Sequence, residues 1–265
     1  MLSITCQEQL LAGDSLEAKW ERAIAVGYDG IELRGRGDLA LERRLPELRR
    51  AAAAGVVMRT VCVDMPHFIG AFDPELRADA VTQLRSQLSV IAELGGIGAM
   101  TPASYGMFSR RLPPFEPPRG EAEDREVLLA GLTELGEHAA REGVTLFLEP
   151  LNRYEDHMVN RLEQAASLID EVGLASVRIG ADTYHMNIEE DRPAAALVEF
   201  AGYVGHVQVS DSNRLQPGAG HLDWRAVLDA LETIGYTGDV ALESRLRGDP
   251  VEAVASVPAF LRAMT

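Results

Sequence analysis

The sequence predicts a single closed (β/α)8 barrel of the TIM type, and three observations lead to this prediction. A helical pattern, a glycine and a short β-branched run recur in this order along the chain. The β-branched runs are continuously apolar rather than alternating, which is typical of parallel strands buried on both faces. The chain has 265 residues, and a single domain of about 250 residues is common for this fold.

Each recurring unit is expected to contain a helix that ends at a glycine. A glycine in the left-handed conformation commonly ends a helix before the chain turns into the next strand. The first helix is expected over residues 15–26. Seven glycines follow expected helices at intervals of 28 to 48 residues, namely Gly27, Gly55, Gly95, Gly143, Gly173, Gly202 and Gly235.

The expected strands are the apolar runs after these glycines, together with an N-terminal run at residues 2–6. Eight strands that alternate with helices describe a closed barrel. The alternative is an open, doubly wound sheet, because residues 35–40 match the GxGxxA pattern of a dinucleotide-binding loop. No acidic residue follows about 20 positions further on at a strand end, where a ribose would need one, so we interpret the match as an ordinary βα loop.

One domain is expected over residues 1–265, because no linker-like segment divides the chain. The irregular stretch at residues 102–120 contains five prolines together with Tyr105, Phe108 and Phe115. A long loop is expected there after the fourth strand. It would serve either as a lid over the barrel mouth or as a rigid surface loop.

The composition narrows the classes of function. The net charge of −16 and the pI of about 4.8 disfavour binding to nucleic acid or to anionic membranes. The N-terminus does not resemble a signal peptide, and no apolar run approaches the roughly 20 residues of a membrane span, so a cytoplasmic protein is expected. The single lysine, Lys19, lies in an expected helix, which disfavours Schiff-base chemistry. Cys6 and Cys62 are expected to be buried and reduced.

Polar side chains end four successive expected strands, the fifth to the eighth. In a barrel of this type, catalytic groups lie at the carboxyl ends of the strands. We therefore expect these four side chains to meet at one rim of the barrel. They are Glu149, Asp182, Gln208 and Glu243, with His206 two residues before Gln208 and pointing the same way.

Three converging carboxylates repel one another, and a divalent cation removes that repulsion. Taken singly, each carboxylate could instead be an ordinary salt-bridged residue of the rim. Their occurrence at four successive strand ends favours one metal site formed by Glu149, Asp182, Gln208 and Glu243. Oxygen ligands favour Mn²⁺ or Mg²⁺, with Co²⁺ or Zn²⁺ as alternatives.

The segments around these residues carry a resemblance to a known superfamily. The segments are residues 148–155 (LEPLNRYE), 181–190 (ADTYHMNIEE), 205–214 (GHVQVSDSNR) and 241–244 (ALES). With these motifs the chain resembles the xylose-isomerase-like TIM-barrel sugar (phosphate) isomerase/epimerase superfamily. Ketose 3-epimerases and hydroxypyruvate isomerases are the most similar members. Ketose 3-epimerases usually have histidine in place of Gln208, whereas hydroxypyruvate isomerases resemble the chain more closely there.

The resemblance implies a divalent-metal-dependent isomerase or epimerase of a small sugar or keto-sugar that works by proton transfer through an enediolate. Glu149 and Glu243 would carry the proton, whereas Glu155, His185 and Arg214 would bind substrate oxygens. His67, near the end of the third expected strand, is a further candidate for substrate binding.

Several alternatives remain open at this stage. A hydroxypyruvate isomerase and an inosose-type dehydratase would use the same metal site. An endonuclease for abasic DNA on the same fold is disfavoured by the net charge and by the count of six histidines. Barrels of this type often bind phosphate in the loops after the seventh and eighth strands, but the loop at residues 211–221 contains Asp211 and no lysine. This favours a substrate without phosphate, either a sugar or a short keto acid. Members of the superfamily commonly form homo-oligomers.

Overall fold

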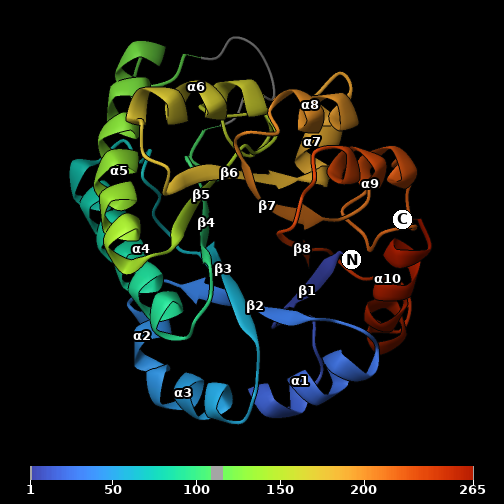
Figure 1. Cartoon of the computed structure of the whole chain (residues 1–265). Helices are drawn as coiled ribbons and strands as arrows, with labels where there is room; N and C mark the ends of the chain where they lie inside the picture. The colour runs from blue at the N-terminus through green and yellow to red at the C-terminus, as the bar shows by residue number, and fades with distance from the viewer. Residues whose placement is uncertain (1, 109–115, 265) are drawn as a thin grey trace.

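A computed structural model shows eight parallel strands that form a closed barrel in the order β1-β2-β3-β4-β5-β6-β7-β8. It describes residues 2–108 and 116–264. The helices surround the barrel (Figure 1), and the barrel closes where β1 pairs with β8. The predicted (β/α)8 fold is therefore confirmed.

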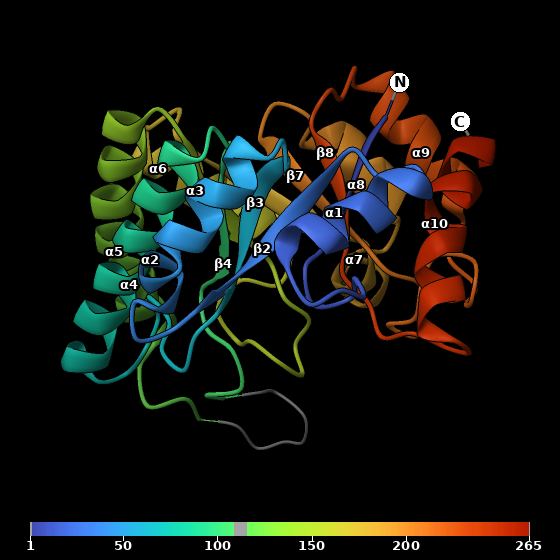
Figure 2. The same cartoon turned by 90° about the horizontal axis from the view of Figure 1, so that it is seen from below.

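The strands are β1 (Ser3–Gln7), β2 (Gly30–Arg36), β3 (Met58–Asp64), β4 (Gly98–Pro102), β5 (Thr145–Glu149), β6 (Val177–Asp182), β7 (Val204–Val209) and β8 (Asp239–Leu242). The helices are α1 (Leu16–Ala25), α2 (Ala40–Arg43), α3 (Leu45–Ala53), α4 (Pro74–Glu93), α5 (Glu121–Glu142), α6 (Leu162–Val172), α7 (Thr183–Glu189), α8 (Pro193–Glu199), α9 (Trp224–Thr233) and α10 (Pro250–Met264). Residues 103–108 after β4 and the connection after β5 leave the barrel at the same end (Figure 2).

The helix ends agree with the sequence pattern except at one position. Ser15 caps α1 by accepting a hydrogen bond from the backbone of Ala18, as the expected start of that helix requires. Six of the seven predicted glycines have positive φ angles, from 63° at Gly235 to 98° at Gly27. The prediction for Gly202 was wrong, because α8 ends earlier, at Glu199, and a turn separates it from β7.

The segment that matches GxGxxA is an ordinary connection between β2 and α2. Gly35 lies inside β2 and packs against α4, where the Gln87 amide donates a hydrogen bond to the Gly35 carbonyl over 2.9 Å. A Cβ atom at Gly35 would lie 2.2 Å from the side-chain oxygen of Gln87. Close packing of the helix on the strand therefore explains this glycine without a nucleotide.

The apolar core lies between the strands and the surrounding helices. Ile31, Leu33 and Val61 on the strands are completely buried, as are Leu84 and Leu88 on α4. Across residues 2–108 and 116–264, no helix has the length and apolarity needed to cross a membrane.

Candidate active site

A cavity of about 530 Å³ opens at the carboxyl ends of the strands. Five of the predicted site residues line this one cavity, namely Glu149, Glu155, His185, Arg214 and Glu243. Residues from β1, β2 and β3 complete the lining, including Gln7, Arg34, Cys62 and Asp64.

The four predicted metal ligands lie on adjacent strands. Glu149 and Asp182 are the last residues of β5 and β6, and Gln208 lies in β7 directly beside Asp182 in the strand register. Glu243 follows β8, where its backbone N–H donates to the carbonyl of Val209. Parallel register therefore brings oxygens from four successive strands to one rim, as the sequence predicts.

Arg214 sits between two of these carboxylates. Its Nη1 is 2.7 Å from Asp182 Oδ2, and its Nη2 is 3.0 Å from Glu243 Oε1. Its guanidinium also lies over the ring of Tyr184, 4.9 Å from the ring centroid. Arg214 itself has a positive φ of 60°, a conformation uncommon for a residue with a side chain.

Burial and mutual repulsion shift the pKa values of the carboxylates. Burial, Glu243 and Asp182 together raise the pKa of Glu149 well above its ordinary range. Burial raises the pKa of Glu243 to about 8, although Arg214 opposes the shift. Burial also acts to raise the pKa of Asp182, but Arg214 and the hydrogen bond from the backbone N–H of His185 outweigh it, and the net shift is downward. A divalent cation among the three groups would favour their charged forms.

Two buried oxygens at the site are suited to a cation. Gln208 Oε1 and Glu243 Oε2 are inaccessible to solvent, and neither accepts a hydrogen bond from any residue in the ranges 2–108 and 116–264. Buried polar atoms in folded proteins are almost always partnered. Both atoms are hard oxygen donors of the kind that Mn²⁺ and Mg²⁺ prefer. The residues present therefore fit a divalent metal ion.

His185 also lies near these carboxylates, since ligand atoms of Glu149, Asp182 and His185 lie within 4.8 Å of one another. Its Nδ1 accepts a hydrogen bond from the backbone N–H of Asn152 and lies 2.9 Å from the Asn152 amide nitrogen. Burial lowers the pKa of His185 to about 4, so the ring is neutral at pH 7. The single ring proton therefore lies on Nε2, and Nε2 is a hydrogen-bond donor rather than a metal ligand.

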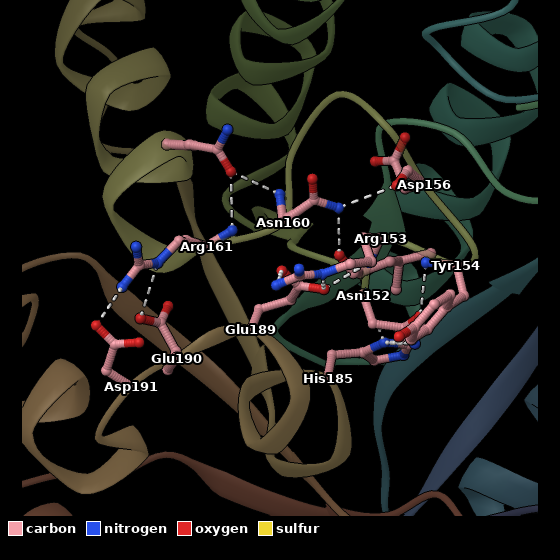
Figure 3. A network of polar contacts seen from close by, with 12 residues as sticks. Asn152, Arg153, Tyr154, Asp156, Asn160, Arg161, His185, Glu189, Glu190 and Asp191 are labelled. Carbon is pink, nitrogen blue, oxygen red and sulfur yellow. Dashed lines mark hydrogen bonds and ion pairs between the residues drawn. The ribbon is translucent and has the colours of Figure 1, made fainter. Parts of the chain in front are cut away.

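The donor Nε2 of His185 faces the cavity. It lies 3.8 Å from Glu149 Oε1 and 3.8 Å from Glu155 Oε2. Figure 3 shows Asn152 against His185, with the neighbouring Arg153 held by Glu189 on α7. The loop after β5 and the helix after β6 are thus tied together behind His185.

Asp211 is a loop-forming residue that the sequence pattern did not single out. Its carboxylate accepts hydrogen bonds from the backbones of Ser212, Gly218 and Leu222 and from the indole N–H of Trp224. These bonds fold the connection between β7 and α9, which carries Arg214. Trp224 itself is buried in the apolar core.

Glu32 is a second residue that the sequence analysis missed. It lies in β2 and is completely buried, and it accepts hydrogen bonds from four side chains. Burial acts to raise its pKa, but bonds from His206, Thr60 and Gln208 outweigh burial and lower it. The sequence does hold one signal for Glu32, because it is an acidic residue inside the otherwise apolar run Gly-Ile-Glu-Leu.

Other expectations have mixed outcomes. His67 is not among the described residues that line the cavity, and its Nδ1 is 2.8 Å from Asp79 on α4. Both cysteines are free, but only Cys6 is fully buried, whereas Cys62 is half-buried and lines the cavity. Tyr105 also lines the cavity. The expected lid includes residues 109–115 with Phe115, which lie outside the described residues.

The chain matches the family described as xylose isomerase-like TIM barrel over residues 20–264. It is 38% identical to a 3-dehydro-D-guloside 4-epimerase of Escherichia coli (strain K12), and the alignment covers 98% of this chain and 99% of that protein. It is 35% identical to a D-psicose 3-epimerase of Enterocloster bolteae, over 84% of this chain and 74% of that protein.

The solved structures agree with the sequence comparison. The apo crystal structure of a 3-keto-D-glucoside 4-epimerase from E. coli superposes with a TM-score of 0.93 at 38% identity, covering 99% of this chain and all of that one. An L-ribulose 3-epimerase superposes with a TM-score of 0.84 at 26% identity. This chain belongs to the xylose isomerase-like TIM barrel family and is an enzyme of the sugar isomerase/epimerase type.

Proposed function

We propose that the enzyme is a divalent-metal-dependent epimerase of a 3-keto-hexoside, which it inverts at C4. The observation that carries this proposal is the pair of unpartnered buried oxygens on Gln208 and Glu243, beside Glu149 and Asp182. The substrate class comes from the similarity to the 4-epimerase of E. coli over nearly the whole of both chains.

Glu149, Asp182, Gln208 and Glu243 would hold the metal. The position of the ring proton of His185 favours this set over one that includes His185. When bound, the cation would polarise the substrate carbonyl and so acidify the neighbouring C–H. Mn²⁺ or Mg²⁺ is the proposed ion, because the four ligands are oxygens.

Glu149 and Glu243 would carry the proton. They stand on β5 and β8, separated around the barrel by β6 and β7, so the substrate can lie between them. One carboxylate removes the proton from C4, and the electron pair of the C–H bond delocalises into the carbonyl at C3 to give an enediolate. The other carboxylate returns a proton to the opposite face of C4, which inverts that carbon without net oxidation.

The remaining residues of the wall would orient the substrate. His185 would donate its Nε2 proton to a substrate oxygen, and Arg214 would bind another. Glu155 lies 3.8 Å from the same Nε2 and can accept a hydrogen bond from a hydroxyl group. The cavity of about 530 Å³ is in the range of small-molecule sites.

The experiment is to incubate the full chain with Mn²⁺ and a methyl 3-keto-glucoside in D₂O and to follow the sugar by NMR. We expect the C4 epimer to form and solvent deuterium to appear at C4. D-Fructose and D-psicose in parallel tubes test the second candidate, a ketose 3-epimerase, which the similarity to D-psicose 3-epimerases supports. Loss of water from an inosose would indicate a dehydratase, and no exchange in any sugar would refute the proposal.

A further inference from the structure

Gln208 has two chemically different ends, and only one of them can bind a cation. Its carbonyl Oε1 is an acceptor, whereas its Nε2 is a donor and would repel a metal ion. An amide can rotate by half a turn at little energetic cost, which exchanges the two ends. A histidine at this position would have no amide group whose oxygen and nitrogen could exchange places. A glutamine ligand therefore needs a neighbour that fixes its orientation.

The carboxylate of Glu32 is such a neighbour. Gln208 Nε2 donates to Glu32 Oε1 over 2.7 Å, and both side chains are completely buried. A carboxylate only accepts hydrogen bonds, so the NH₂ end of the amide must face Glu32. The carbonyl Oε1 then points away from Glu32, and it is the atom that no described residue contacts through a hydrogen bond.

Glu32 is itself held in place by three further donors. Its Oε1 accepts from Gln7 Nε2 over 3.1 Å, and its Oε2 accepts from Thr60 Oγ1 over 2.7 Å. His206 Nε2 lies 2.8 Å from the same Oε2. The donors come from β1, β3 and β7, so the carboxylate is fixed from three other strands of the barrel.

From these contacts we propose that Glu32 is a positioning residue that orients the Gln208 amide for metal binding. This inference rests on the proposed metal site. Groups that orient metal ligands in this way typically change metal affinity roughly 10–100-fold when removed. Through Glu32, β2 would help to form the metal site although it contributes none of the four proposed ligands.

The test is a double-mutant cycle read out as the Kd for Mn²⁺, measured by calorimetry on the full chain. Glu32→Gln can donate to Gln208 as well as accept from it, and it allows the amide to turn. We expect the Kd to rise roughly 10–100-fold in the wild-type background. In a Gln208→Ala background, Glu32→Gln should change the Kd by less than about threefold, because coupled effects vanish when the partner is absent.

Equal effects in the two backgrounds would show that Glu32 acts through its charge alone and would overturn the inference. Glu8→Gln is the matched control, because it changes another buried carboxylate to an amide at a residue that is bonded to Arg44 and Arg34 rather than to Gln208. The Kd in this variant should stay within about threefold of wild type. A loss of binding in this variant as large as that in Glu32→Gln would also overturn the inference.

The exchange of the two groups, Glu32→Gln with Gln208→Glu, keeps the total charge and serves if the single variant does not fold. It restores an amide donor facing a carboxylate, and we expect Mn²⁺ to bind at least as tightly as in wild type. A folded exchange variant that fails to bind Mn²⁺ contradicts the inference. If wild type itself neither binds Mn²⁺ nor epimerises, the proposed function fails; if wild type does both and Glu32→Gln binds normally, only the role of Glu32 fails.

Discussion

Proton transfer at carbon requires a carboxylate that is both charged and close to the substrate. Glu149 is buried and Glu243 is half-buried at the barrel mouth, where removal from solvent and neighbouring acids raise their pKa values. A bound cation would offset this shift and keep both carboxylates ionised at neutral pH, so that either can accept a proton. The proposed metal site and the proposed acid–base pair therefore share the same carboxylates.

We expect Glu149→Gln and Glu243→Gln each to lower kcat by roughly 10²–10⁴-fold, the usual contribution of a general base. The measurement is the rate of C4 epimerisation at saturating Mn²⁺. Asp182→Asn is the comparison, because Asp182 is assigned to metal binding alone. Excess Mn²⁺ should rescue Asp182→Asn in part but neither glutamate variant, and a glutamate variant with over about a tenth of wild-type rate would remove that residue from the proton-transfer step.

The positions of the four proposed ligands at one rim could be predicted from the sequence because each lies at or near the end of an apolar run, and strand ends meet at one rim. Glu32 could not be predicted in this way. Its partners His206 and Gln208 lie 174 and 176 residues further along the chain, so the pairing exists only in the folded barrel. The proton position on His185 likewise depends on a contact with Asn152 that no local pattern indicates.

The ends of helices show, at the scale of a whole element, the same limit of prediction from the sequence. Gly202 and Gly235 occur in similar phrases, GYVG and GYTG, and both follow helical patterns. Gly235 has a φ of 63°, whereas Gly202 is not in the left-handed region. The difference arises because α8 stops at Glu199 and the chain turns before Gly202, whereas α9 continues to Thr233, two residues before Gly235.

Gly235→Ala should lower the free energy of unfolding by about 1 kcal/mol, because a side chain is strained in the left-handed conformation. A Cβ atom at Gly235 meets nothing within 4 Å, so the change tests backbone strain without a clash. Gly202→Ala is the matched control, since its Cβ would also have open space. Urea unfolding measures both variants, and an equal loss of stability in the two would contradict this explanation.

An ion pair joins the start of the barrel to its outer helices. Glu8, which follows β1, accepts two hydrogen bonds of 2.8 Å from Arg44 between α2 and α3, and one from the backbone of Arg34 in β2. Burial acts to raise the pKa of Glu8, but the bonds from Arg44 and Arg34 outweigh it and lower the pKa. The pair therefore fixes three segments relative to one another.

A lowered pKa in the folded state means that Glu8 stabilises the fold above its unfolded pKa of about 4.3. This contribution should be lost as the pH falls below that value through the folded pKa. Glu8→Gln removes it, so the difference in unfolding free energy between wild type and variant should shrink on acidification from pH 7 to pH 3. Urea unfolding across this range measures the difference, and a constant difference would exclude the ionised pair as its source.

For the molecule as a whole, metal binding and folding stability are linked. The proposed ligands come from β5, β6, β7 and β8, and they converge only when these strands are in register. The unfolded chain cannot present such a site, so Mn²⁺ should stabilise the folded state. At a free concentration one hundredfold above its Kd, the gain is about 2.7 kcal/mol, or roughly 5–10 °C in Tm.

Thermal unfolding with EDTA and with Mn²⁺ measures this difference. In the double variant Glu149→Gln with Glu243→Gln, Mn²⁺ should move Tm by less than about 2 °C over the same concentrations, because two of four ligands are lost. A full shift in the double variant would place the bound ion elsewhere on the protein.

The four hydrogen bonds to Glu32 have a consequence for how the chain acquires its site during synthesis. The proposed ligands are synthesised in the last half of the chain, whereas Glu32 is synthesised near the beginning. Glu32 can form its hydrogen bond with Gln208 only after β7 has been made. The C-terminal half expressed as a separate fragment would carry every proposed ligand and yet lack the group that orients Gln208. We therefore expect the proposed site to bind metal only after the barrel has closed, so that the ion would stabilise the closed barrel rather than direct its assembly.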